Sequence, residues 1–291
     1  MKDINVFCFG FGQVAKNFIN KLNSENYKIN LSITSRSETS IEKFNDFSYQ
    51  NFLFNNEKFD KNLIIKLKEA DHILISIPPV NKEDLVIKKF SKIIEESKAK
   101  WITYLSATSV YGDHKGKWVD ENSETKPTTV KGRERLIAEN SWASFEKNKK
   151  LPIQIFRLSG IYSTERNILV RLIAGNVKLI DKKHHYFSRI HVEDIANLLF
   201  KSLSNFKSGE IYNLSDDKPT PSEEVTLYGA SILNLQDLKK IKEHEIESEM
   251  LKNFYKESKR VNNKKIKSYF NYNLKFPTYI EGLNYIRDKL I

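Results

Sequence analysis

The sequence predicts an α/β fold in which a doubly wound parallel sheet is followed by a smaller mixed α/β lobe. Short apolar runs alternate with helical patterns through the first 160 residues, and beyond that point the alternation stops. Near-continuous apolar strands between helices are typical of a parallel sheet covered on both faces. We therefore expect residues 1–160 to form the sheet domain and residues 161–291 to form mainly the second lobe.

Apolar periodicity gives the elements in chain order. In the sheet domain, strands are expected at 5–10, 29–34, 51–54, 72–77, 101–105 and 153–158, and helices at 13–22, 62–69, 84–96 and 133–147. In the second lobe, helices are expected at 192–203, 222–233 and 246–255, and a strand at 211–214. We expect the 192–203 helix to pack back on the sheet domain.

The bulk composition restricts the class of protein. Hydrophobic residues make up 40% of the 291 residues, yet no run approaches the roughly 20 apolar residues of a membrane span. The chain enters a strand-like run almost at once, which predicts no signal peptide. The single cysteine, Cys8, excludes an internal disulfide framework and is expected to be a buried thiol. A cytoplasmic protein is the resulting expectation.

The net charge of +11 rests mainly on lysine. Of the 48 Lys and Arg residues 9 are Arg, which leaves 39 Lys, and the chain is also rich in Asn and Ile. This composition favours lysines spread over solvated faces and argues against a nucleic-acid footprint. The densest basic run, at 256–267, is interrupted by polar and acidic residues, and a phosphate-bearing ligand could still meet it.

The first predicted strand runs into a Gly-x-Gly-x-x-Ala turn. The first glycine permits the tight turn, the second lets the backbone approach a pyrophosphate, and Ala15 lets the helix pack against the strand. The helix N-terminus then offers free N–H groups to phosphates. The context favours a dinucleotide site over a plain structural turn. Its expected contacts are Gly10, Phe11, Gly12, Gln13 and Val14.

The end of the second predicted strand bears on the choice of dinucleotide. An acidic residue there would bind the ribose 2′-hydroxyl of NAD, and this chain has Ser35 and Arg36 instead. Arginine can pair with a 2′-phosphate and stack on adenine, so the sequence favours NADP over NAD. The alternative is an arginine that is simply exposed. Ile77, Pro78 and Pro79 end the fourth strand, where an apolar wall for adenosine is expected.

Further motifs follow the turn in a fixed order, at 105–112, 132–136, 157–162, 189–196, 212–219 and 277–282. Together they make the chain similar, nearly end to end, to the atypical extended short-chain dehydrogenase/reductases. These are the nucleoside-diphosphate-sugar epimerase/dehydratase relatives of the YeeZ kind. The resemblance implies an NAD(P)-binding Rossmann domain, a C-terminal substrate lobe and a small-molecule substrate such as a nucleotide sugar. It also implies that Ser106 contacts the cofactor and that Arg189 faces the substrate.

The family's catalytic relay is replaced as a set. The resemblance places Ala107 where active members carry Ser or Thr, Lys131 at the general-base Tyr, and Arg135 at the Lys that lowers the pKa of that Tyr. Hydride transfer at a sugar carbon needs a group that moves the hydroxyl proton. Arg135 cannot be a base because the pKa of arginine stays above about 12. Thr108 and Tyr111 are the remaining hydroxyl candidates.

Lys131 leaves three interpretations open. It could act as a base only if burial and the neighbouring arginines lowered its pKa substantially. Lys131 and Arg135 could instead be anion contacts for a cofactor or a phosphorylated substrate, which we favour. Both could also be exposed helix charges. The sequence leaves open whether the chain is an enzyme, with a catalytically silent dinucleotide-binding or redox-sensing module as the alternative to an active oxidoreductase or isomerase.

Two remaining points concern partners. His184, His185 and His191 cluster in the sequence, but nothing nearby has metal-ligand spacing, so we predict no metal site. Oligomeric state is not determined by the sequence, and a homodimer is one of the open arrangements.

Overall fold

The computed structural model describes residues 2–182 and 185–290. Contacts between residues divide the chain into two compact units. The first unit consists of Met1–Ser106, Glu134–Arg157 and Ile195–Ile211. The second unit consists of Ala107–Arg133, Leu158–Asp194 and Tyr212–Ile291.

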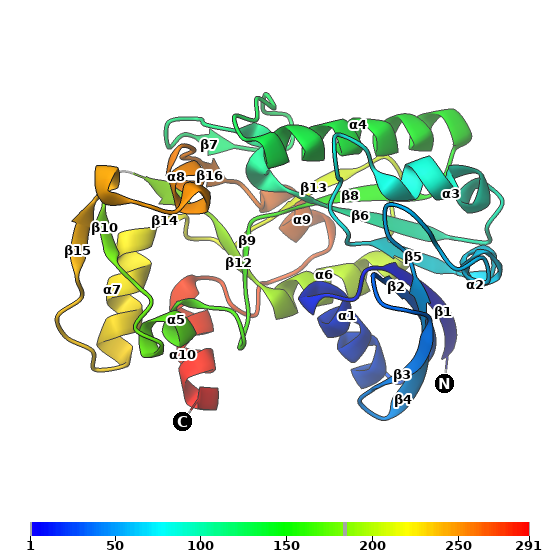
Figure 1. Cartoon of the computed structure of the whole chain (residues 1–291), viewed down its shortest axis with the longest axis horizontal. Helices are drawn as coiled ribbons and strands as arrows, with labels where there is room; N and C mark the ends of the chain where they lie inside the picture. The colour runs from blue at the N-terminus through cyan, green and yellow to red at the C-terminus, as the bar shows by residue number, and fades with distance from the viewer. Residues whose placement is uncertain (1, 183–184, 291) are drawn as a thin grey trace. The chain divides into compact units, whose positions relative to one another are not determined.

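A mostly parallel sheet runs through the first unit (Figure 1). Its order is β13-β8-β6-β5-β1-β2-β4-β3. The bounds are β1 (Lys2–Phe9), β2 (Tyr27–Ser35), β3 (Ser40–Phe44), β4 (Phe47–Leu53), β5 (His72–Ile75), β6 (Trp101–Ala107), β8 (Ile153–Leu158) and β13 (Ile211–Leu214). In the register of the parallel strands around β1, Val6 lies opposite Leu31 on one side and His72 on the other. The Rossmann-type α/β fold predicted from the sequence is confirmed.

Helices cover both faces of this sheet, as Figure 1 shows. They are α1 (Gln13–Ser24), α2 (Leu63–Glu69), α3 (Leu85–Glu95), α4 (Val130–Lys149) and α6 (Val192–Ser204). On one face, Phe90 of α3 and Trp142 of α4 join a buried cluster with the β1 side chain Phe7. On the other face, Phe18 of α1 stacks on Trp101 with ring centroids 5.7 Å apart, and the Trp101 indole donates to Ser202 of α6 at 2.9 Å.

A hairpin, and not a helix, connects β2 to the next parallel strand. The chain turns at Asn45, whose φ is 52°, so that β3 runs antiparallel to β4 before β4 pairs in parallel with β2. The sequence predicts only a short strand at 51–54 here. Polar side chains, among them Asn30, Ser32 and Gln50, line a hollow of about 550 Å³ over this part of the sheet. Their polarity suits a sheet face that stays in contact with water.

The second unit contains short strand pairs and helices around its own core. Its elements are η1 (Thr108–Tyr111), β7 (Trp118–Val119), β9 (Gly160–Tyr162), α5 (Ile168–Ile173), β10 (Leu179–Asp181), β11 (Tyr186–Phe187), β12 (Arg189–His191), β14 (Thr220–Pro221), α7 (Ser222–Ile232), β15 (Lys240–Lys242), η2 (Glu243–Glu245), α8 (Glu249–Tyr255), β16 (Arg260–Val261), α9 (Lys264–Tyr269) and α10 (Tyr279–Leu290). Leu169, Val225 and Leu283 bury the contact between α5, α7 and α10 (Figure 1). A Cβ at Gly282 would overlap the Tyr162 ring, so glycine allows the close packing of α10.

Most predicted elements of the second lobe are confirmed. The strand at 211–214 and the helices at 192–203 and 222–233 agree with β13, α6 and α7 to within one residue. The place of the strand was predicted wrongly, because β13 is an edge strand of the eight-stranded sheet and not part of a separate second-lobe sheet. The helix predicted from residue 246 begins later, at Glu249, because the Ser248 hydroxyl accepts a hydrogen bond from the Leu251 N–H and caps α8.

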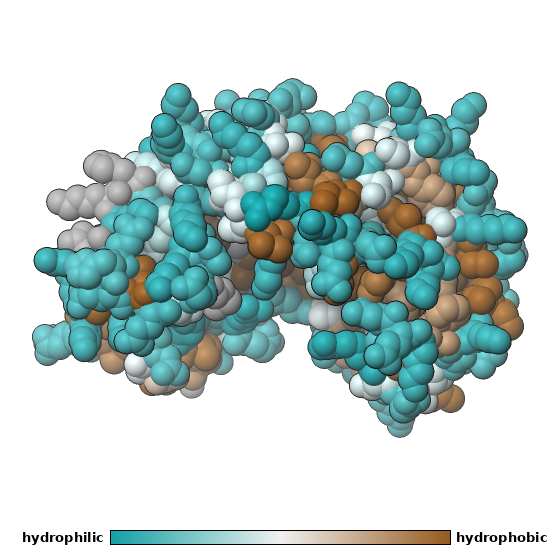
Figure 2. All heavy atoms as spheres, turned by 45° about the horizontal axis from the view of Figure 1, so that its top comes forward, coloured by the Kyte–Doolittle hydropathy of each residue, from teal (hydrophilic) through white to brown (hydrophobic). Residues whose placement is uncertain are grey.

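The surface of the described residues is mainly polar. Figure 2 shows hydrophilic side chains over most of one face, with hydrophobic patches between them. Among residues 2–182 and 185–290, no helix is both long enough and apolar enough to cross a bilayer.

Candidate functional site

The turn after β1 is built around Gly10. Its φ of +86° lies in the left-handed region, and an added Cβ would lie 2.8 Å from Ile77 Cγ2 and 2.9 Å from Ser76 Oγ. The Gly10 N–H donates to Thr34 Oγ1 at 3.2 Å, and Ser76 Oγ donates to the Phe9 carbonyl at 2.9 Å. Only glycine fits this conformation in this space. The two hydrogen bonds of the turn hold β1, β2 and β5 together at their carboxyl ends.

Gly12 is the open position of the same turn. It is the N-cap of α1 with φ −82°, and a Cβ added there would meet no atom within 4 Å. Nothing in the local packing therefore requires glycine at this position. The first turn of α1, which begins at Gln13, carries no acidic residue and leaves N–H groups without intrahelical acceptors. Phe11 lies to one side, with its ring centroid 5.2 Å from those of Phe44 and Tyr49. Val14 is buried against the sheet.

The residues expected around an adenosine lie at the ends of β2 and β5. Arg36 is exposed just after β2, and the Ser35 hydroxyl accepts a hydrogen bond from the Ser37 N–H at 3.1 Å. Ile77 is half-buried, Pro78 is exposed and Pro79 is buried. The Arg36 side chain is therefore accessible to solvent.

A buried ion pair joins α4 to the sheet. Arg157 of β8 donates to Glu139 of α4 through Nε and Nη2, with the shortest distance 2.8 Å to Oε2. Ser106 of β6 donates to the same carboxylate. Arg157, Glu139 and Ser106 are all less than 5% exposed. The Ser106 hydroxyl, predicted to contact the cofactor, is thus part of the contact that fixes α4 on the sheet.

The two cations of α4 lie in different surroundings. Arg135 is half-buried, and its Nη1 donates to the Leu105 carbonyl at 2.9 Å and to the Tyr104 hydroxyl at 3.2 Å. Lys131, one turn earlier, is exposed.

The hydroxyl candidates belong to the second unit. Thr108 is buried at 8% exposure at the start of η1. Tyr111 is fully buried, and its hydroxyl donates to Asn213 Oδ1 at 2.8 Å. Gly132 allows α4 to begin beside η1, because a Cβ there would lie 2.8 Å from the Ser109 carbonyl. Ala107 is half-buried and offers no hydroxyl.

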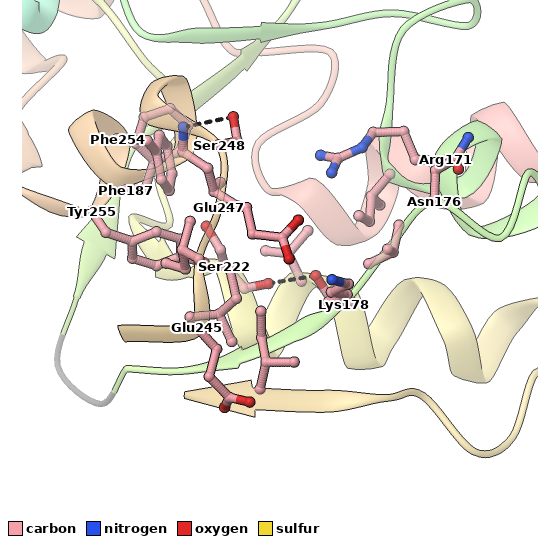
Figure 3. Close-up of a pocket in the computed structure, with 18 of the residues that line it drawn as sticks. Arg171, Asn176, Lys178, Phe187, Ser222, Glu245, Glu247, Ser248, Phe254 and Tyr255 are labelled. Carbon is pink, nitrogen blue, oxygen red and sulfur yellow. Dashed lines mark hydrogen bonds between the residues drawn. The ribbon is translucent and has the colours of Figure 1, made fainter. Parts of the chain in front are cut away.

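The second unit also contains a cavity of about 810 Å³ (Figure 3). Its walls come from α5, α7, α8 and the segments around β10, β11 and β15. They combine apolar side chains with hydroxyls and charges of both signs. The polar and charged lining residues are Arg171, Asn176, Lys178, Arg189, Ser222, Thr226, Glu245, Glu247, Ser248 and Tyr255. Its size and mixed lining are those of a small-molecule site.

Arg189 is anchored in the wall of this cavity. Its Nη1 donates to the carbonyls of Phe187 and Thr220 at 3.0 and 2.9 Å, and its Nη2 donates to Ser222 Oγ at 3.1 Å. Burial lowers the pKa of Arg189, and the nearby Asp216 carboxyl opposes that shift. Of the site residues predicted from the sequence, Arg189 alone lines this cavity.

Asp216 is the most perturbed acid of the second unit. Burial raises the pKa of its carboxyl to about 8, although Arg189 and the Lys218 N–H favour the charged form. The Asp216 charge in turn contributes to the raised pKa of Tyr162, for which burial is the larger cause. Burial thus favours the protonated form of the Asp216 carboxyl.

We expect Asp216 to make stability fall as pH rises. A carboxyl with a raised pKa binds a proton on folding, so its contribution is fully present below the unfolded pKa of 3.8 and is lost as pH rises through about 8. His72, His185 and His191, whose pKa values burial lowers, oppose this trend near pH 6.5, because they still bind protons there in the unfolded state. Between pH 7 and 8 we therefore expect Asp216 itself to lower the free energy of unfolding by up to about 1.4 kcal/mol per pH unit, measured as the difference between the wild type and Asp216→Asn. Urea unfolding followed by circular dichroism measures this slope.

Asp216→Asn should remove this dependence on pH. The matched control is Asp288→Asn, which removes a surface carboxylate that pairs with Arg287. The control variant should keep the wild-type slope of the free energy of unfolding against pH. A wild-type slope in Asp216→Asn as well would contradict the assignment of this pH dependence to Asp216.

The histidines do not form a cluster around a metal in the described residues. His184 lies outside them, His185 packs against Phe254 and Tyr255, and His191 packs against Tyr162 and Phe276. Within residues 2–182 and 185–290, no group of three His, Cys, Asp or Glu side chains could hold a metal ion. The Cys8 thiol is buried, and burial raises its pKa.

Comparisons with known proteins agree with this architecture. Residues 89–215 match the family model of the NAD dependent epimerase/dehydratase family. A structure of a functionally unknown conserved protein from Silicibacter pomeroyi is 31% identical, with a TM-score of 0.86 over 99% of both chains. The chain belongs to the NAD-dependent epimerase/dehydratase family. No curated protein matches the sequence.

More distant members of the family share the fold. UDP-N-acetylglucosamine 4-epimerase from Bacillus cereus is 15% identical, with a TM-score of 0.75 over 99% of both chains. The NAD complex of dTDP-glucose 4,6-dehydratase from Bacillus anthracis is 17% identical, with a TM-score of 0.74 over 99% of this chain and 97% of the other. The chain thus has the fold of nucleotide-sugar epimerases and dehydratases.

Several residues of the second-unit cavity carry no signal in the sequence. Arg171, Lys178 and Glu247 come from three separate segments, and each reads as one more surface charge in a lysine-rich chain. Arg171 follows the Asn167 cap of α5, whose side chain accepts from the Val170 N–H at 3.1 Å. The Asn167 cap is a sequence signal that could have predicted the short helix α5. It could not have predicted the cavity.

Proposed function

We propose that the chain binds a nicotinamide dinucleotide at the Gly10–Ala15 turn and acts on a nucleotide sugar in the second unit. The observation that carries the proposal is the contrast between the two glycines of the turn. Gly10 is required by its own conformation and neighbours, whereas Gly12 faces open space and is required by nothing in the chain. A pyrophosphate approaching the backbone at the start of α1 accounts for that second glycine. Family members crystallised with NAD support the cofactor class.

The proposed chemistry uses a proton carrier other than the family's tyrosine. In this proposal Lys131, which is exposed, and Arg135, which is half-buried, contact an anionic group of the cofactor or substrate. Thr108 and Tyr111 are then the hydroxyls left for proton transfer.

A catalytically silent dinucleotide-binding module is the second candidate. The observation that favours it is that the polar groups near the positions of the family's catalytic residues already form hydrogen bonds within the protein. Ser106 donates to Glu139, Tyr111 donates to Asn213, and Arg135 donates to the Leu105 carbonyl. Turnover of NAD(H) or NADP(H) with any sugar nucleotide that is lost in Lys131→Ala would decide for the active enzyme.

We expect the chain to bind NADP more tightly than NAD. Arg36 is exposed at the end of β2, where it can pair with a 2′-phosphate. Arg36→Gln should weaken NADP binding at least about tenfold, or about 1.4 kcal/mol, and leave NAD binding nearly unchanged. Calorimetric titration of both cofactors measures the ratio.

The matched control for this titration is Lys28→Gln, which removes an exposed cation from the opposite end of the same strand. Equal affinities of the wild-type chain for NADP and NAD would overturn the NADP preference but not the proposed function. Failure to bind either cofactor would overturn the proposed function.

A further inference from the structure

Charges of both signs face the cavity of the second unit. Arg171 of α5 and Lys178 before β10 are on one side, and Glu247 is on the segment between η2 and α8. Figure 3 shows the Arg171 guanidinium and the Glu247 carboxylate projecting into the same space from different walls. With Arg189, the lining of the cavity includes three cations and, counting Glu245, two carboxylates.

The charges nearest the open space have no partner among the side chains that the structure describes. Among residues 2–182 and 185–290, the side chains of Arg171, Lys178 and Glu247 form no hydrogen bond or ion pair. Glu245, by contrast, accepts from the Lys242 N–H at 2.6 Å and lies at the edge of the cavity in Figure 3. The unpaired groups are therefore two cations and one carboxylate.

A purely anionic ligand matches this lining only in part. A diphosphate would pair with Arg171 and Lys178, but its charge would also face the Glu247 carboxylate. Water screens this repulsion in part, because Arg171, Lys178 and Glu247 are all exposed, but a negative charge beside the Glu247 carboxylate remains unfavourable. A ligand with both an anionic and a cationic group would satisfy all three side chains.

We infer that the second-unit cavity binds a nucleotide sugar that carries a free, protonated amino group. This inference rests on the proposed function, because it takes the nucleotide sugar from there and adds the amine. The phosphates pair with Arg171 and Lys178, and the ammonium pairs with Glu247. Ser222 and Tyr255 offer hydroxyls beside apolar side chains such as Val225 for the remaining sugar and base surfaces.

The test compares three ligands that share one nucleotide: UDP-glucosamine, UDP-N-acetylglucosamine and UDP-glucose. They are titrated by calorimetry into the full chain with cofactor present, below the pKa of the ligand amine. We expect UDP-glucosamine to bind at least about tenfold more tightly than either neutral-sugar ligand. Glu247→Gln should reduce this ratio to about one without weakening UDP-N-acetylglucosamine, because the variant removes a repulsive charge. Arg171→Gln should weaken all three ligands.

The matched control is Glu249→Gln, which removes an exposed carboxylate that pairs with Lys252 outside the cavity. It should keep the wild-type ratio. Equal binding of the three ligands, or a preference that survives in Glu247→Gln, would overturn the inference and leave the proposed function standing. A chain that binds the cofactor but none of the three ligands would overturn the proposed substrate class, and the inference with it.

Discussion

Arg157→Met should destabilise the first unit by about 3–5 kcal/mol, the largest effect on stability that we expect from a single substitution. The Glu139 carboxylate is 2% exposed and receives its charge compensation from Arg157, with the Ser106 hydroxyl as a further donor. Removing the guanidinium leaves a buried negative charge without an opposite charge. Loss of this contact also frees α4 to rotate, and with it Arg135.

Intrinsic fluorescence during urea unfolding reports this change. Trp101 and Trp142 are buried in the first unit, whereas Trp118 in the second unit is 54% exposed. The buried pair should therefore dominate the change in emission. The control Lys149→Met removes a surface pair with Glu95 and should cost less than about 1 kcal/mol.

A second variant keeps the prediction testable if Arg157→Met does not fold. Glu139→Met combined with Arg157→Met removes both charges and should recover most of the lost stability, since apolar replacement of a whole buried pair is often neutral. Stability of Arg157→Met within about 1 kcal/mol of wild type would show that the pair does not hold α4.

The regular elements could be predicted because they repeat a local pattern. The apolar runs of β1, β5 and β8 and the periodic face of α3 are visible within short windows of the sequence, and each is where the pattern places it. The β3–β4 hairpin was missed because its residues alternate weakly and its face is polar. The signal that could have revealed it is the Asn45-Asp46 pair between Phe44 and Phe47, typical of a tight hairpin turn.

The site could be predicted only where one continuous motif builds it. The Gly10–Ala15 turn is six residues long, so the residue types that its backbone conformation requires are adjacent in the sequence. The Glu139–Arg157 pair and the cavity charges join residues from separate elements, and nothing local distinguishes them from solvated side chains. Only the fold shows that Ser106 and Arg157 meet the Glu139 carboxylate.

Gly12→Ala should abolish most cofactor binding and leave the fold intact. The backbone at Gly12 has φ −82°, which alanine adopts without strain, and the added Cβ would meet no protein atom within 4 Å. The loss of stability should therefore stay below about 1 kcal/mol, the scale of an N-cap change. If the pyrophosphate approaches this backbone as we propose, the methyl group occupies its space and affinity should fall at least about tenfold.

Gly10→Ala separates the two roles of the turn. Here φ is +86° and the new Cβ would lie 2.8 Å from Ile77 Cγ2, so we expect a lower melting temperature as well as weaker cofactor binding. Calorimetric titration and thermal unfolding, carried out on both variants, distinguish these outcomes. Unchanged cofactor affinity in a folded Gly12→Ala protein would mean that the open space at Gly12 does not receive a pyrophosphate. Gly12 would then be a glycine that neither the fold nor the ligand requires.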